Sequence, residues 1–409
     1  MKYKIHDIDG LTLITSHMSD THTITAEIFV KAWAVYEDNR TNWLSHFLEH
    51  MFFKWSKKFD TAEKVSRYIE SFGWEYNAYT WRELAWYYVK SASEYINNSL
   101  EILWDLMCSP IFDPTEIDKE HGVVIQEIKM YEDRPQSLVS QNWRNWYKWD
   151  TSHWWTILGP EKNVSSFTQQ DLFNHKKSLY TKDNLILVIA WNITDEDKVL
   201  ELAKKHFSDL PSTGKNKTVE YTTYLPKEKA KVLKKGISQN HLVMYADGFS
   251  REHWNFHTYC AKILSKILGW NTSSRLRQKI REEMGLCYYI WAGHGRSQKY
   301  GTFSINCWLD KKNFVQGVSE IYNQIWNIVE HGITSEEFDF AINNSLWSLQ
   351  MGIETSSELS DWIWSDYILN KEINTIEDIV KIYKSITMKD IQNIISKLDK
   401  DNRYMYHIE

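Results

Sequence analysis

The chain has 409 residues, of which 43% are hydrophobic and 25% are charged, and its formal net charge at pH 7 is −6. This composition is typical of a folded globular protein, and the length favours two domains of roughly 200 residues over a single core. The acidic balance argues against a nucleic-acid-binding protein, and the absence of a Lys/Arg block argues against a membrane-surface protein.

The N-terminal residues alternate between apolar and polar side chains, which predicts strands at 11–16 and 23–31. This pattern lacks the continuous apolar core of a signal peptide. No later run of about 18 apolar residues could span a bilayer. We therefore expect a cytoplasmic protein without a membrane partner.

A helix predicted at 44–53 carries the run His46-Phe47-Leu48-Glu49-His50. Residues four apart share one helix face, so His46 and His50 can point at one metal ion, with Glu49 close enough to take a proton from metal-bound water. The order H-x-x-E-H is a zinc-peptidase signature that lacks only a third ligand. Two helical histidines can also be surface residues that bind nothing.

The next elements follow in short order. A capping-box-like start at Asp60–Glu63 predicts a helix that stops at Gly73, and strands are predicted at 75–79 and 84–90. A further helix is predicted at 95–108, where Pro110 ends it.

The helix predicted at 115–131 carries two carboxylates, Glu120 and Glu127, which are seven residues apart. Seven residues make two helical turns, so the two side chains share a face. Two carboxylates on an otherwise apolar face suit a metal ligand and a nearby helper. A solvated acidic stripe gives the same spacing, and periodicity does not separate the two interpretations.

The polar segment 209–229 is the best linker candidate, because it contains prolines and a glycine and has no long periodic pattern. It predicts a first domain at 1–210, a linker at 211–228 and a second domain at 229–409. The second half repeats the order of predicted elements, but it has no histidine pair that matches His46 and His50. Only the first half is therefore expected to bind metal.

Four segments in this order, HFLEHMFFK, FGWEYNAYT, EHGVVIQEIKMYEDRP and ILGPEKNVSSFTQQDL, resemble the inverzincin peptidases of the insulinase and pitrilysin superfamily. The size is similar to that of the small branch, which includes the mitochondrial processing peptidase and its bacterial relatives. The resemblance implies an α+β fold of two similar domains, each a largely antiparallel sheet with helices packed on one face. It also implies a zinc metalloendopeptidase that hydrolyses short or unfolded peptides.

The resemblance assigns roles to matched positions. His46 and His50 would be ligands of one Zn²⁺ per chain, and Glu49 would be the general base. Glu127 would be the third ligand, and Glu120 would be the second carboxylate that supports it.

Two further motifs concern the substrate. Asn77 and Ala78 match the strand whose edge binds the substrate backbone, and Arg281 and Tyr288 resemble the Arg/Tyr motif that contacts substrate and the developing oxyanion. Taken alone, Arg281 would be a surface ion-pair residue and Tyr288 a half-buried core ring. In the small branch the metal ligands and the Arg/Tyr motif form the two halves of one active site, and a partner subunit supplies the Arg/Tyr half. Because this chain carries both halves, we expect a homodimer in which Arg281 and Tyr288 act in trans.

The main alternative is a non-catalytic subunit of the same fold that binds peptides or a catalytic partner. Such subunits typically lose the metal ligands, whereas this chain retains them. A purely structural zinc site is disfavoured, because three protein ligands leave the open fourth position of a catalytic site.

Tryptophan is unusually frequent, with 21 Trp against 15 Gly. The family pattern has glycine or another small residue at six positions where this chain has tryptophan: Trp33, Trp43, Trp55, Trp74, Trp191 and Trp270. Glycine tolerates positive φ and close backbone approach, whereas six indoles there would overpack the fold by several kcal/mol. Our hypothesis is that these codons are UGA, which some bacterial lineages read as glycine.

Overall fold

The computed structural model describes residues 2–32, 36–80, 84–148, 155, 159–193, 195–214, 225–251, 255–297 and 299–409. The chain divides into two compact units, each assembled from three segments. The first unit consists of Met1–Met130, Asp150–Thr222 and Gly352–Ile373, and the second of Tyr131–Trp149, Thr223–Met351 and Asn374–Glu409. Each unit therefore includes a short segment from the opposite half of the chain. The domain boundaries at 210 and 229 stay a prediction.

The first unit is built on a six-stranded sheet that is antiparallel except for one parallel pair, β2 with β6. Its strands lie in the order β1 (Lys2–Ile8), β2 (Leu11–His17), β6 (Leu185–Trp191), β3 (Thr23–Val30), β5 (Ala85–Ala92) and β4 (Gly73–Thr80). Strand β4 therefore forms one edge of the sheet.

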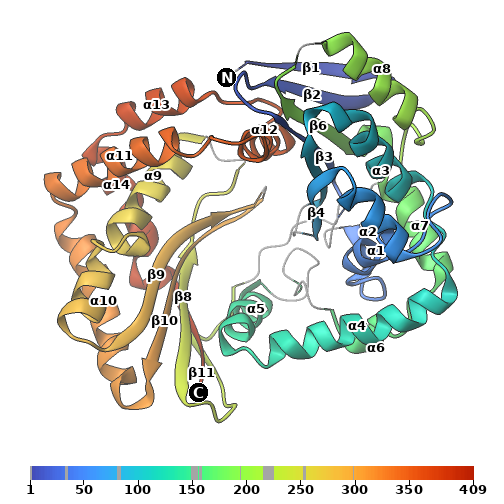
Figure 1. Cartoon of the computed structure of the whole chain (residues 1–409). Coiled ribbons are helices and arrows are strands. Elements are labelled where there is room, and N and C mark those ends of the chain that lie inside the picture. Colours follow the sequence, from blue (N-terminus) through green and yellow to red (C-terminus); the bar gives the residue numbers. More distant parts are fainter. Residues whose placement is uncertain are drawn as a thin grey trace. The chain divides into compact units, whose positions relative to one another are not determined.

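Side chains alternate along the strands of this sheet, so that both faces are buried. On β3, Ile28 and Val30 face the larger core, whereas Phe29 between them belongs to a second apolar cluster that includes Ile363. The helices of the unit are α1 (Leu44–Phe52), α2 (Ala62–Glu70), α3 (Ile96–Cys108), α4 (Pro114–Glu132), α6 (Glu161–Val164), α7 (Gln169–Leu179), α8 (Glu196–Phe207) and α12 (Ser356–Asn370). Figure 1 shows α12 beside β6 and β3, and α12 packs against both strands.

The second unit is built on a five-stranded sheet with one parallel pair, β7 with β11. Its strands lie in the order β7 (Ala230–Leu233), β11 (Arg403–Ile408), β8 (Gln239–Asp247), β10 (Gly301–Asp310) and β9 (Cys287–Arg296). Its helices are α5 (Pro135–Lys148), α9 (Asn255–Ser265), α10 (Phe314–His331), α11 (Ser335–Gln350), α13 (Ile376–Ser385) and α14 (Met388–Ile395).

The two sheets have the same topology. The order β2-β6-β3-β5-β4 in the first unit matches β7-β11-β8-β10-β9 in the second, and in both the first two strands form the parallel pair. Helix α5 packs on β8 and β11, where Tyr147 and Tyr245 place their ring centroids 4.3 Å apart. The α+β fold class with two similar units is confirmed.

Most predicted elements occur close to their expected bounds. The metal-motif helix spans 44–52. The N-cap of α2 is Thr61, whose side chain accepts a hydrogen bond from the N–H of Lys64, so the cap lies one residue after the start of the predicted Asp60–Glu63 pattern. None of the helices in the described part of the chain combines the length and the hydropathy required to span a membrane.

Candidate metal centre

Helices α1 and α4 bring three potential metal ligands together. Nε2 of His46 lies 3.2 Å from Oε2 of Glu127, and Nε2 of His50 lies 3.5 Å from the same oxygen. One ligand atom from each residue can be chosen so that all lie within 4.8 Å of one another. Two atoms that each lie about 2.1 Å from a tetrahedral zinc ion are roughly 3.4 Å apart. The donor set and its spacing therefore fit zinc.

Glu120 lies behind this group rather than within it. Its carboxylate is buried, with one oxygen 2.7 Å from Nδ1 of His50 and the other 2.6 Å from Nζ of Lys54. A hydrogen bond donated by Nδ1 of His50 to Glu120 makes Nε2, which faces Glu127, the ring nitrogen that can bind a metal. Carboxylates fix metal-binding histidines in this way. Lys54 was not predicted, although it follows His50 by four residues.

The carboxylates around His46 and His50 stabilise the protonated form of both imidazoles. Burial disfavours the charged form of His50, but hydrogen bonds to Glu120 and Glu127 outweigh burial and raise the pKa of His50 to about 9. Burial is likewise outweighed at His46, where Glu127 and Glu49 raise the pKa. Burial is also outweighed at Glu127, where the two histidines hold the pKa of the carboxyl well below its usual range. The carboxylates favour positive charge at this point, which a divalent cation also supplies.

Glu49 lies on the same helix as the two histidines. It is largely buried, and Oε2 lies 3.7 Å from Nδ1 of His46. The hydroxyl of Thr80, the last residue of β4, donates a hydrogen bond to the same oxygen. Thr80 was not predicted. Its only signal in the sequence is its position at the end of the EYNAYT segment.

The predicted substrate residues lie on β4. Asn77 and Ala78 pair with Tyr88 and Tyr87 of β5, and β4 has no strand on its other side within the described residues. Asn77 is exposed, whereas Ala78 is buried. A sheet edge of this kind can accept an extended peptide through main-chain hydrogen bonds.

Arg281 and Tyr288 lie in the second unit and contact each other. Arg281 belongs to a π-helical segment, Arg277–Glu283, and its guanidinium lies 5.5 Å from the centroid of the Tyr288 ring. In β9, Tyr289 pairs with Trp308 and Cys287 pairs with Leu309. Tyr288 is therefore the extra residue of a β-bulge, and 74% of it is exposed to solvent. The alternative interpretation of Tyr288 as a half-buried core ring is therefore wrong.

Trp43 occupies a backbone conformation that favours glycine. It is the N-cap of α1 with φ 87° and ψ 6°, in the left-handed region. Its ring is buried and stacked on the imidazole of His46, with centroids 4.7 Å apart, and its indole N–H has no hydrogen-bond partner within the described residues.

The other tryptophans of the glycine hypothesis do not share the backbone conformation of Trp43 within the described residues. Trp55, Trp191 and Trp270 are described and have no positive φ. Trp191 is buried in β6, and Trp270 is exposed. Trp33 and the side chain of Trp74 lie outside the described residues. Within the described residues, Trp43 is thus the member of the set whose backbone supports the hypothesis directly.

Comparison with known proteins places these residues in a family. The model described as "Insulinase (Peptidase family M16)" matches residues 12–152, which contain His46, His50 and Glu127. The model described as "Peptidase M16 inactive domain" matches residues 166–345. The inactive-domain match thus begins after the predicted ligands and includes Arg281 and Tyr288.

Individual relatives agree with this match. A Bacillus subtilis protein named "Uncharacterized zinc protease YmxG" is 27% identical over 391 residues, which cover 95% of this chain and 94% of that protein. The "Mitochondrial-processing peptidase subunit beta" of Bos taurus is 34% identical over 202 residues, which cover 49% of this chain and 41% of that protein. A protease from Helicobacter pylori has the same fold, with a TM-score of 0.91 at 20% identity over 100% of this chain and 99% of that one. The chain belongs to the insulinase family, peptidase family M16, and resembles its mitochondrial-processing-peptidase branch.

Proposed function

We propose that this chain is a zinc metalloendopeptidase that hydrolyses short or unfolded peptides. The observation that carries the proposal is the convergence of His46, His50 and Glu127 at the spacing of zinc ligands, with Glu49 on the same helix. Three protein ligands leave a fourth position for water or substrate, which is the arrangement of catalytic zinc sites. A structural zinc site would need a fourth protein ligand.

Each residue then has a defined task. A bound zinc ion would lower the pKa of its water and polarise the scissile carbonyl. The carboxylate of Glu49 would hold the proton from that water and donate it to the nitrogen of the leaving amine. Glu120 would keep Nε2 of His50 free for the metal, and the edge of β4 would align the substrate backbone. Donors from Arg281 and Tyr288 would stabilise the oxyanion.

Removal and return of the metal tests the proposal. Treatment with a chelator should abolish hydrolysis of a peptide library, and added zinc should restore it in the wild type. E127Q should not recover, because it lacks the third ligand. D118N is the matched control, since Asp118 is exposed on the same helix, and it should recover like the wild type. Hydrolysis by the wild type that survives complete removal of metal would contradict the proposal.

We also propose that the active form is a homodimer in which Arg281 and Tyr288 serve the metal centre of the partner subunit. The support is the resemblance to the small branch and the presence of both halves in this one chain. A non-catalytic role as a partner subunit is the alternative, and the retained ligand set makes it the weaker candidate.

A further inference from the structure

A buried carboxylate lies at the N-terminus of the metal-motif helix. The carboxylate of Glu37 accepts hydrogen bonds from the backbone N–H of Trp43, at 2.8 Å, and from that of Ser45, at 2.7 Å. These groups belong to the first turn of α1, where N–H groups have no partner within the helix. Trp43 occupies the N-cap position and provides no side-chain cap. Glu37, six residues before the N-cap, therefore does what the side chain of the N-cap residue usually does.

The first turn of α1 also makes a side-chain contact with α7. The hydroxyl of Ser45 lies 2.8 Å from Nε2 of His175 on α7, and both residues are buried. Ser45 directly precedes the predicted ligand His46. Its main chain is thus bound by Glu37 and its side chain by His175, and these contacts together restrict rotation of the first turn of α1.

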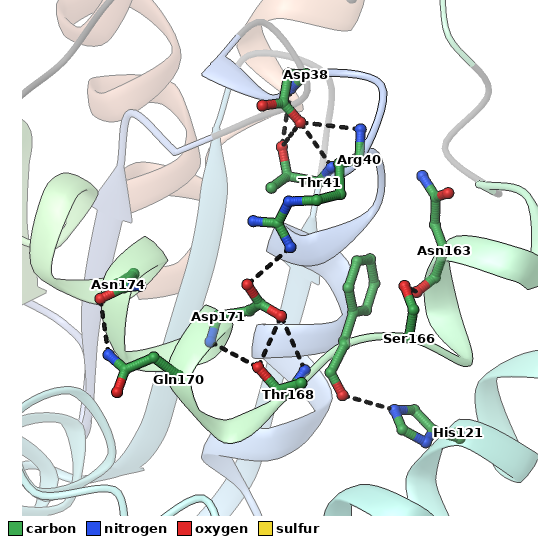
Figure 2. A network of polar contacts seen from close by, with 11 residues as sticks. Asp38, Arg40, Thr41, His121, Asn163, Ser166, Thr168, Gln170, Asp171 and Asn174 are labelled. Atoms are coloured by element: carbon green, nitrogen blue, oxygen red, sulfur yellow. Dashed lines mark hydrogen bonds and ion pairs between the residues drawn. The ribbon is translucent and has the colours of Figure 1, made fainter.

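The residues that follow Glu37 form a second set of polar contacts, which Figure 2 shows. Asp38 accepts hydrogen bonds from the backbone N–H groups of Arg40 and Thr41, at 2.9 Å and 2.8 Å. The guanidinium of Arg40 extends to Asp171, at 2.8 Å, and Asp171 also forms the capping box of α7 with Thr168. Helix α7 therefore holds this loop through Asp171 and α1 through His175, one turn further along.

We propose that Glu37 is a positioning residue for the metal centre, which fixes the first turn of α1 and thereby the direction of the His46 imidazole. The inference rests on the proposed zinc site. A buried carboxylate is a costly way to cap a helix, because its charge must leave water. Both of its oxygens are used on the turn that carries His46, and this rigidity is what a metal ligand requires of its support.

The test compares E37Q with E27Q. Glu27 is the matched control, because it is a fully buried carboxylate of the same unit that accepts a hydrogen bond from Ser360 of α12 and belongs to β3. The amide of E37Q has one oxygen and directs its NH₂ at a backbone N–H, so one of the two capping bonds is lost. We expect E37Q to weaken zinc binding by roughly 10–100-fold, the usual loss for a supporting residue, and to alter the visible spectrum of the cobalt-loaded protein. E27Q should change neither.

Other outcomes distinguish failure of the positioning role from failure of the proposed zinc site. Unchanged zinc affinity and cobalt spectrum in E37Q would overturn the positioning role, and so would an equal loss in E37Q and E27Q, since it would indicate general destabilisation. A wild type that binds neither metal would instead defeat the proposed zinc site itself. If E37Q does not fold, S45A, which removes only the link to His175, is measured in the same way. A cobalt spectrum shifted from that of the wild type is expected, and an unshifted one would count against the inference.

Discussion

At the scale of single residues, the metal centre combines features that a sequence reveals with features that it does not. His46, Glu49 and His50 are evident from their spacing on one helix. Thr80 contacts Glu49, and Glu37 contacts the backbone at the start of the same helix, but neither is marked by a helical spacing. Their roles depend on where loops and strand ends lie in space, so no local pattern could predict them.

The backbone at Trp43 leads to a prediction about stability. A residue with a Cβ atom pays about 1–2 kcal/mol for a left-handed backbone, and glycine does not. We expect W43G to be about 1 kcal/mol more stable towards urea than W43A. Both variants delete the indole ring, so the comparison isolates the backbone conformation.

Equal stability of W43G and W43A would show that φ at this position carries no strain. The gene gives an independent check of the glycine hypothesis for the whole set. UGA codons at the six tryptophan positions would support it, and UGG codons would refute it.

At the scale of elements, the two helices predicted to carry the metal ligands lie close to their predicted bounds. The predicted helix at 115–131 is observed as α4 at 114–132, and it carries Glu120 and Glu127 on the side that meets α1. The spacing of Glu120 and Glu127 along this helix is equally consistent with an acidic stripe exposed to solvent. Only the position of α1 shows that both carboxylates have histidine partners.

The contact between α1 and α7 predicts a pH dependence of stability. Burial lowers the pKa of His175 to about 4, whereas an unfolded histidine titrates near about 6.5. Between these values the unfolded chain binds a proton that the folded chain does not. The free energy of unfolding should therefore fall as the pH falls from 6.5 to 4, by up to about 3 kcal/mol.

Urea unfolding between pH 4 and 7 measures this effect. H175Q cannot titrate, so its stability should depend less steeply on pH than that of the wild type over this range. H22Q is the control, because His22 is exposed, and it should parallel the wild type. Parallel curves for H175Q and the wild type would show that His175 does not carry the effect.

At the scale of the whole molecule, the sequence predicted the duplicated architecture better than it predicted which chain segments belong to which unit. The repeated order of elements in the sequence corresponds to two sheets with the same strand order, each with one parallel pair. The sequence did not indicate that Gly352–Ile373 belongs to the first unit and Tyr131–Trp149 to the second. Such an exchange depends on which sheet face each helix covers, and helical periodicity carries no information about the partner.

The proposed dimer can be tested by complementation. E49Q lacks the general base and Y288F lacks the phenol, so each homodimer should be inactive or strongly impaired. If Tyr288 acts in trans, a mixed dimer contains one metal centre with both groups intact. Mixing the two variants under conditions of subunit exchange should then restore hydrolysis. Failure of an exchanged mixture to regain activity, or an active wild-type monomer on size exclusion, would contradict the dimer.

The central claim is that Glu49 acts on water at a zinc ion held by His46, His50 and Glu127. The most direct test measures zinc content and peptide hydrolysis on the same samples of wild type and E49Q. We predict one zinc per chain in both proteins, and a rate for E49Q that is lower by roughly 10²–10⁴-fold, the usual contribution of a general base. Equal hydrolysis by E49Q and wild type, or a wild type without zinc, would contradict the account.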